Sequence, residues 1–321
     1  MNLSTKLQPV FIISAALIGL LLGGGTSFGD YSVGLVEPFL MALLFMVFLS
    51  VDLKSIKEAF TNYKFTVTSL LVNFVWTPIF AVLLGMIFLH DSLDLQVGFL
   101  MLLVTPCTDW YLVFTGLSKG NVALATAVLP LNLILQVALL PIYLFTFYGS
   151  KVGMDGADVL WSIIIVLVIP MVLAQLVKLA ARKMNRLKAV VQGLLDRSDN
   201  LQLVFLCIAV IAMFASEGKA LLSNPLLLVQ MLAPLACFFT INFLLVYAIA
   251  KRLRMSFYDT VPLIITTLAR NSPLSLAIAV AAFPDRPLIS LALVIGPLIE
   301  LPVLGIVSSI LLRLGKRQQV Q

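Results

Sequence analysis

The sequence predicts an all-α integral membrane protein with ten transmembrane helices, arranged as two inverted five-helix repeats. Apolar residues make up 61% of the chain and charged residues 11%, whereas about 25% charged residues is usual in a soluble domain. The mean hydropathy is +1.10. Apolar stretches of about 20 residues, long enough to cross a ~30 Å hydrocarbon core as helices, recur along the chain. The basic residues gather in alternate loops, as they do in membrane proteins.

Hydropathy divides the chain into ten apolar segments separated by short polar loops. We expect these spans at about 9–26, 35–50, 65–89, 97–117, 121–147, 158–178, 200–216, 227–250, 258–283 and 287–312. The first is interpreted as a retained span because it has one Lys ahead of it and no clear cleavage site of small residues.

The distribution of Lys and Arg predicts the orientation. One set of alternate loops and both termini carry most of the 21 basic residues, while the other loops carry only Lys151, Lys219 and Arg286. We therefore expect a multi-pass protein of the inner membrane with both termini in the cytoplasm. The net charge of +6 follows from this topology and is weak evidence for nucleic acid as a partner. The expected partners are the lipid bilayer and a small-molecule or oxyanion substrate.

An internal repeat emerges when the prolines are aligned. Pro106 and Pro273 are as far apart in sequence as Pro130 and Pro297. Asn-Phe pairs in the third and eighth spans, at Asn73 and Asn242, match at nearly the same separation. Halves with an odd number of spans lie inverted in the membrane, a known transporter plan.

The half boundary divides the chain into a first five-helix repeat, residues 1–150, and a second, residues 151–321. The fourth and ninth spans, one from each half, are predicted to be discontinuous. Each has polar residues followed by a proline, which removes a backbone hydrogen bond and clashes with the preceding turn. Freed backbone groups at this depth are tolerated when they are buried in protein or line a cavity. The alternatives are a pair of proline kinks repaired by hydroxyl groups and a binding site near the membrane midplane.

Three charged residues lie in the interior of the apolar segments, away from the segment ends: Asp109, Arg270 and Glu300. Intramembrane charges are rare, costly and associated with ion or substrate paths. Asp109 and Arg270 could pair, as a structural salt bridge or as part of a site. Glu300 could carry a proton, ligate a cation or be a neutral acid bonded to a freed carbonyl.

Polar residues elsewhere in the spans have two interpretations. Asn132 and Gln136 share one helix face and, with Asn73 and Asn242, line a path or link helices. Cys107 adjoins the first break. Its thiol is either a small packing group or a soft ligand for a metalloid.

Several segments together resemble the arsenical resistance permeases, which export arsenite. They are Cys107, Leu112–Phe114, Leu117–Asn121 and Leu131–Gln136, followed by Leu276–Ala281 and Val294–Val303. Those permeases share a superfamily with the bile acid:sodium symporters, whose ten spans form inverted repeats with unwound, crossing fourth and ninth helices. The resemblance implies that Cys107 is the cysteine that the exporters need and Glu300 their acid in the tenth span.

The chain departs from both groups. Ser275 stands where the exporters carry a glutamate, and Thr266 and Arg270 stand where the symporters carry Glu and Gln. Asn73 matches their third-span glutamine, and Asp109 matches neither group. Arg270 is then either a fixed cation in the place of a metal ion or an attractor for an anionic substrate.

These observations predict a gradient-driven secondary transporter and no enzyme, with no cofactor apart from Na⁺ or H⁺ as coupling ion. The expected activity is efflux of arsenite or a related small solute; the alternatives are sodium- or proton-coupled transport of a small organic anion and a membrane sensor or scaffold. The expected site residues are Cys107, Thr108, Asp109, Arg270, Asn271 and Ser272 for substrate; Asp109, Glu300, Asn73, Thr266 and Ser275 for ion coupling; and Asn132, Gln136 and Asn242 along the path.

Overall fold

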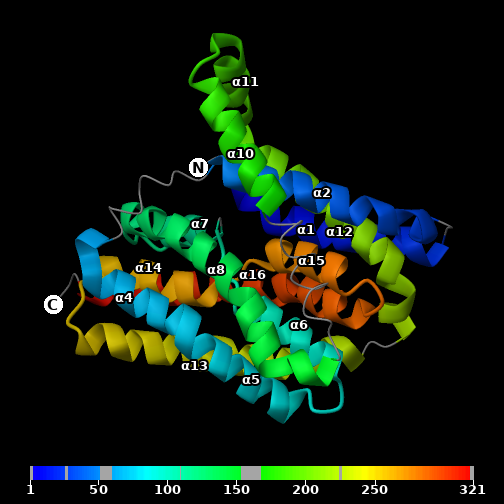
Figure 1. Ribbon diagram of the computed structural model, residues 1–321. Helices are drawn as coiled ribbons and strands as arrows, with labels where there is room; N and C mark the ends of the chain where they lie inside the picture. Colours follow the sequence, from blue (N-terminus) through cyan, green and yellow to red (C-terminus); the bar gives the residue numbers. More distant parts are fainter. Residues whose placement is uncertain are drawn as a thin grey trace. The chain divides into compact units, whose positions relative to one another are not determined.

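The computed structural model describes residues 3–25, 28–50, 60–108, 110–152, 168–223 and 226–318. Every element in these ranges is a helix (Figure 1), which confirms the all-α class. Four helical stretches are long and apolar enough to cross a membrane: Phe60–Phe88, Val122–Gly149, Val229–Arg252 and Pro287–Gly315. A fifth arises if the bent pair Asn185–Leu195 and Asn200–Ser216 counts as one span. The chain is therefore a multi-pass membrane protein, while the full set of ten crossings stays a prediction.

The helices coincide with the apolar segments wherever both can be compared. In chain order they are α1 (Leu3–Gly25), α2 (Phe28–Ser50), α4 (Tyr63–Leu71), α5 (Thr77–Phe88), α6 (Leu93–Leu103), α7 (Trp110–Leu117), α8 (Val122–Val152), α10 (Ile169–Ala181), α11 (Asn185–Leu195), α12 (Ser198–Ser223), α13 (Leu226–Arg252), α14 (Phe257–Leu268), α15 (Ser272–Ala282) and α16 (Pro287–Gln318). Residues 158–167 of the sixth predicted span fall outside the described residues.

The chain forms two compact units, each with segments from both sequence halves. The first contains residues 1–51, 153–227 and 273–294, and the second contains residues 52–152, 228–272 and 295–321. The division of the sequence into two repeats at residue 150 stays a prediction, because membership of a compact unit does not test it.

In the first unit, α1 packs closely against α12 through two glycines one helical turn apart, Gly19 and Gly23. A methyl group at Gly19 would lie 2.6 Å from the carbonyl oxygen of Ile211, far inside van der Waals contact. A methyl group at Gly23 would collide with the carbonyl of Ala215. Small residues at this spacing let two membrane helices approach backbone to backbone.

In the second unit, α4 and α5 are joined by a π-helical turn, Val72–Trp76, and form one continuous rod (Figure 1). A π turn leaves main-chain carbonyls outside the regular ladder and often marks a functional position. The hydroxyl of Tyr143 donates to the carbonyl of Phe74 at 2.6 Å. A side chain of α8 therefore satisfies one of these groups.

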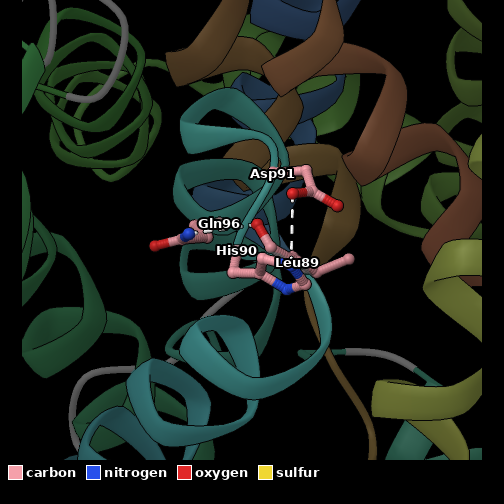
Figure 2. Close-up of polar contacts among 4 residues, drawn as sticks. All are labelled: Leu89, His90, Asp91 and Gln96. Carbon is pink, nitrogen blue, oxygen red and sulfur yellow. Dashed lines mark hydrogen bonds and ion pairs between the residues drawn. The ribbon is translucent and has the colours of Figure 1, made fainter.

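A tight turn joins α5 to α6 in the same unit (Figure 2). The side-chain amide of Gln96 donates to the carbonyl of Leu89 at 3.0 Å and stabilises the turn. Its tip carries the exposed ion pair of His90 and Asp91, 3.1 Å apart. Such an exposed pair contributes little to stability, and the turn serves to reverse the chain.

At the other end of this unit, the N-termini of three helices meet on Asp259. Asn62, Asn121 and Ser256 cap α4, α8 and α14 respectively, each accepting a backbone N–H three residues on. The Asp259 carboxylate accepts from the side-chain amides of Asn62 at 3.3 Å and Asn121 at 2.8 Å. An acidic group at helix N-termini is stabilised by their positive dipole ends. We call this group the Asp259 clamp.

Candidate functional site at the crossing of two broken helices

Two spans of the second unit are broken, as their prolines predict. Regular helix stops at Leu103 in the fourth span and at Leu268 in the ninth. The unwound residues that follow pair as an isolated antiparallel bridge between Pro106 and Arg270. The N–H of Cys107 donates to the carbonyl of Ala269 at 3.0 Å, and the N–H of Asn271 donates to the carbonyl of Thr105 at 2.7 Å.

The bridge explains how the proline is accommodated. Pro106 has no N–H to contribute, and its bridge position needs none because the two bonds come from its neighbours. The two bonds pair four main-chain groups of the unwound segments, and such pairing is what a buried break inside a membrane requires.

Threonine hydroxyls donate hydrogen bonds to main-chain carbonyls in the last turns of both helices. The Thr105 hydroxyl lies 3.0 Å from the carbonyl of Met101, and the Thr267 hydroxyl lies 2.8 Å from the carbonyl of Leu263. Both side chains are fully buried. The hydroxyl repair and the binding-site interpretations of these breaks are therefore compatible.

The guanidinium of Arg270 is enclosed by the carboxyl ends of the two helices. Its Nη1 donates to the carbonyl of Leu103 at 2.7 Å, its Nε donates to the carbonyl of Leu268 at 3.2 Å, and its Nη2 donates to the carbonyl of Thr267. The ring of Phe238 lies 5.0 Å from the guanidinium carbon, within the range of a cation–π contact. Arg270 is 2% exposed, so its charge is stabilised by carbonyl dipoles and a ring.

Glu300 reaches the crossing from α16. Its Oε1 accepts the backbone N–H of Arg270 at 2.9 Å, and its side chain is 3% exposed. The predicted partner of Arg270 was Asp109, which lies outside the described residues, so that pairing stays a prediction. The sequence identified Glu300 as a charge within the tenth span but offered no signal that it would bond the backbone of Arg270.

Three buried asparagines converge on the last turn of α14. The amide of Asn73 donates to the carbonyl of Thr266 at 3.5 Å, that of Asn132 donates to the Thr266 hydroxyl at 3.3 Å, and that of Asn242 donates to the carbonyl of Thr267 at 2.6 Å. Because each Nδ2 faces an oxygen, each Oδ1 is left as the free end, and none of the three has a partner among the described residues. Buried polar atoms normally have partners. These oxygens could therefore accept a bond from water or from a transported species.

The remaining predicted residues differ in their placement. Cys107, Thr108, Asn271 and Ser272 lie buried in the two unwound segments or directly after them, with 2–7% exposure. Gln136 is fully buried, and neither of its side-chain amide atoms has a partner in the part of the chain that the structure describes. Ser275 is fully buried in α15, in the first unit.

Sequence analysis missed two contributors to this site. Phe238 supplies the ring against Arg270, and nothing distinguishes it in sequence from other phenylalanines of an apolar span. The three carbonyls around Arg270 belong to Leu103, Thr267 and Leu268, and main-chain groups leave no trace in residue identity. The proline that breaks each span was the indirect signal for them.

Known proteins resemble this chain over most of its length. An Arsenical-resistance protein Acr3 of Corynebacterium glutamicum is 25% identical, over 95% of this chain and 88% of that protein. A protein of the same name from Alkaliphilus metalliredigens is 25% identical, over 84% and 78% of the two chains. An uncharacterized transporter of Synechocystis sp. is 23% identical, over 95% and 87%.

The family assignment rests on a match over more than half of the chain. Residues 37–224 match the model of the Sodium Bile acid symporter family, which confirms the resemblance identified from the sequence motifs. The family is one of symporters and the Synechocystis relative is named a transporter, so the chain is a membrane transporter and not an enzyme. The chain belongs to the Sodium Bile acid symporter family.

Proposed function

We propose that this protein is a gradient-driven secondary transporter of the inner membrane that exports arsenite or a related small solute. The observation that carries the proposal is the buried thiol of Cys107, held by its backbone N–H in the crossing. A thiolate is a soft ligand suited to metalloids. Two similar proteins bear an arsenical-resistance name, which supports the same substrate.

The proposed architecture is ten spans in two inverted repeats with both termini in the cytoplasm. Paired breaks at Pro106 and Pro273 support it, because substrate sites in such transporters lie where discontinuous helices meet. Substrate would contact Cys107, Thr108 and Ser272 at the unwound segments. The free Oδ1 atoms of the asparagines around Thr266 would bond water or solute hydroxyls along the path.

Protons are the coupling ion that we propose, with Glu300 as the carrier. A buried carboxylate beside a backbone N–H can exist in both charge states, and intramembrane acids commonly form proton relays. Asp109 is a second possible carrier on the evidence of sequence alone.

The experiment is arsenite accumulation in everted membrane vesicles under an imposed pH gradient. We expect gradient-dependent uptake by the wild type. In Cys107→Ala the uptake should fall at least tenfold, which corresponds to about 1.4 kcal/mol. Cys207→Ala is the matched control, since Cys207 lies in the other compact unit. Equal uptake by wild type and Cys107→Ala would exclude Cys107 as a ligand. No uptake by either protein, with both present in the membrane, would exclude arsenite.

A second candidate function is transport of a small organic anion. It is favoured by the family description, which names bile acid. The same vesicles test it with a labelled bile acid in place of arsenite, and uptake that survives Cys107→Ala would identify this function.

A further inference from the structure

The carboxyl ends of two half-helices point at one place in the second unit. α6 ends at Leu103 and α14 at Leu268, and each end carries unsatisfied carbonyls and the negative pole of the helix dipole. Two such ends together make an oxygen-lined position that favours a cation. In other broken-helix transporters, positions of this kind hold a coupling ion.

The chain fills this position with its own side chain. All three donor nitrogens of Arg270 described above bond main-chain carbonyls from the two helix ends. Glu300 bonds the backbone N–H of the same residue. The crossing therefore contains an acid, carbonyl oxygens and a cation, which are the components of an occupied ion site. With its nitrogens occupied and 2% exposure, the guanidinium is a poor docking point for a substrate anion.

We infer that Arg270 is a resident cation that takes the place of a dissociable coupling cation and makes the transporter independent of sodium. Only the flux experiment described below rests on the proposed function; the melting experiment does not. Removing the guanidinium while keeping the backbone takes one donor from each of the carbonyls of Leu103, Thr267 and Leu268. The Thr267 carbonyl keeps its bond from Asn242, and the oxygens released at the crossing, with Glu300, form a cage for a cation. Sodium, a hard cation with a preference for oxygen ligands, is the species that such a cage would admit.

The first test measures sodium binding without any substrate. Purified wild type, Arg270→Gln, Arg270→Lys and the exposed control Arg313→Gln are melted in sodium chloride and in choline chloride of equal ionic strength. Only Arg270→Gln should melt higher in sodium, by roughly 2–4 °C at a concentration ten times the dissociation constant. Arg270→Lys keeps a cation and should respond as the wild type does.

Two results would overturn the inference. One is a folded Arg270→Gln protein whose melting temperature is the same in both salts. The other is a wild type that is itself stabilised by sodium, a result that does not depend on whether Arg270→Gln folds.

The transport arm uses proteoliposomes and arsenite. Wild-type flux should be unchanged when choline replaces sodium, and Arg270→Gln flux should be lost in choline and partly restored by sodium. If arsenite is not a substrate, the wild type shows no flux in either salt and the proposed function fails. The melting experiment is unaffected by that failure and still decides the role of Arg270.

Discussion

Glu300 and Arg270 are both ionisable and buried, yet their hydrogen bonds differ. The guanidinium bonds the ends of helices, whereas the Glu300 carboxyl group bonds one backbone N–H. That N–H remains when the Arg270 side chain is replaced, so substitutions at the two positions remove different hydrogen bonds.

The substitution Glu300→Gln should separate folding from coupling. The amide oxygen of Gln can still accept the Arg270 N–H, so expression and melting temperature should stay close to wild type. The neutral amide cannot carry a proton, so arsenite uptake should lose its response to an imposed pH gradient. The measurement is uptake against gradient size in everted vesicles.

Glu300→Leu is the control for this experiment. It leaves the Arg270 N–H without its acceptor, which costs about 1–3 kcal/mol for a buried group, and its melting temperature should fall. A Glu300→Gln protein that still concentrates arsenite in proportion to the gradient would rule out Glu300 as the proton carrier.

Sequence alone predicted the residues of the crossing better than their contacts. The rarity of charge in an apolar segment identified Arg270 and Glu300, because intramembrane charge is costly. It could not identify their partners, since these are mostly backbone atoms. The Asp109–Arg270 pairing was argued from the repeat, which relates breaks to each other but says nothing of α16.

At the scale of helices, the Asp259 clamp ties together the starts of α4, α8 and α14. Asp259→Ala should lower the free energy of unfolding by about 1–2 kcal/mol, because two side-chain bonds and a favourable dipole interaction are lost. Thermal unfolding of the purified protein measures this.

Asp285→Ala is the matched control, since Asp285 is exposed in the loop before α16. Its melting temperature should stay at the wild-type value. If Asp259→Ala and Asp285→Ala have the same melting temperature, the Asp259 clamp contributes nothing to stability.

Two glycine-to-alanine substitutions in the first unit are expected to have opposite effects on stability. Gly19→Ala places a methyl group 2.6 Å from the Ile211 carbonyl and should destabilise by about 1–3 kcal/mol, the usual range for overpacking. Gly34→Ala on α2 has no neighbour within 4 Å of the added methyl group. It should stabilise slightly, because Ala favours helix over Gly by up to ~1 kcal/mol.

Paired melting curves of the two variants and wild type give the answer. A Gly19→Ala protein as stable as Gly34→Ala would show that α1 and α12 are not in close contact at this position.

Prolines account for the breaks in the helices and for one finer irregularity. Pro106 and Pro273 marked the two unwound segments because proline disrupts a helix locally. The π turn at Val72–Trp76 is followed by Pro78, which has no N–H for the carbonyl of Phe74 four residues before it. Sequence could indicate this unpaired carbonyl but not Tyr143, which bonds it. The loop after the sixth span contains α11, a helix that hydropathy hides because its sequence is half polar.

For the whole molecule, the positive-inside distribution predicts which loops face the cytoplasm. In a protein whose three native cysteines are replaced, His90→Cys should react with a membrane-impermeant thiol reagent applied to intact cells. Lys188→Cys should react only after the membrane is opened. Both sites are exposed, so a difference in labelling reports sidedness. Labelling of Lys188→Cys in intact cells would invert the proposed topology.

Class and family were accessible from sequence because both depend on features spread along the chain. Apolar composition fixed the class, and motifs in the fourth, fifth, ninth and tenth spans led to the family that the match at residues 37–224 confirms. The compact units were not accessible. Each draws on three separate stretches of chain, a grouping decided by long-range packing.

The bridge between Pro106 and Arg270 has a consequence for how such proteins diversify. Its two bonds join the N–H groups of Cys107 and Asn271 to the carbonyls of Ala269 and Thr105. Any amino acid can supply these carbonyls, and any except proline can supply the N–H groups. Side chains in the crossing can thus be exchanged while the main-chain ties that hold it stay in place. Single substitutions at these positions can therefore change the transported substrate while the main-chain bonds of the crossing are kept.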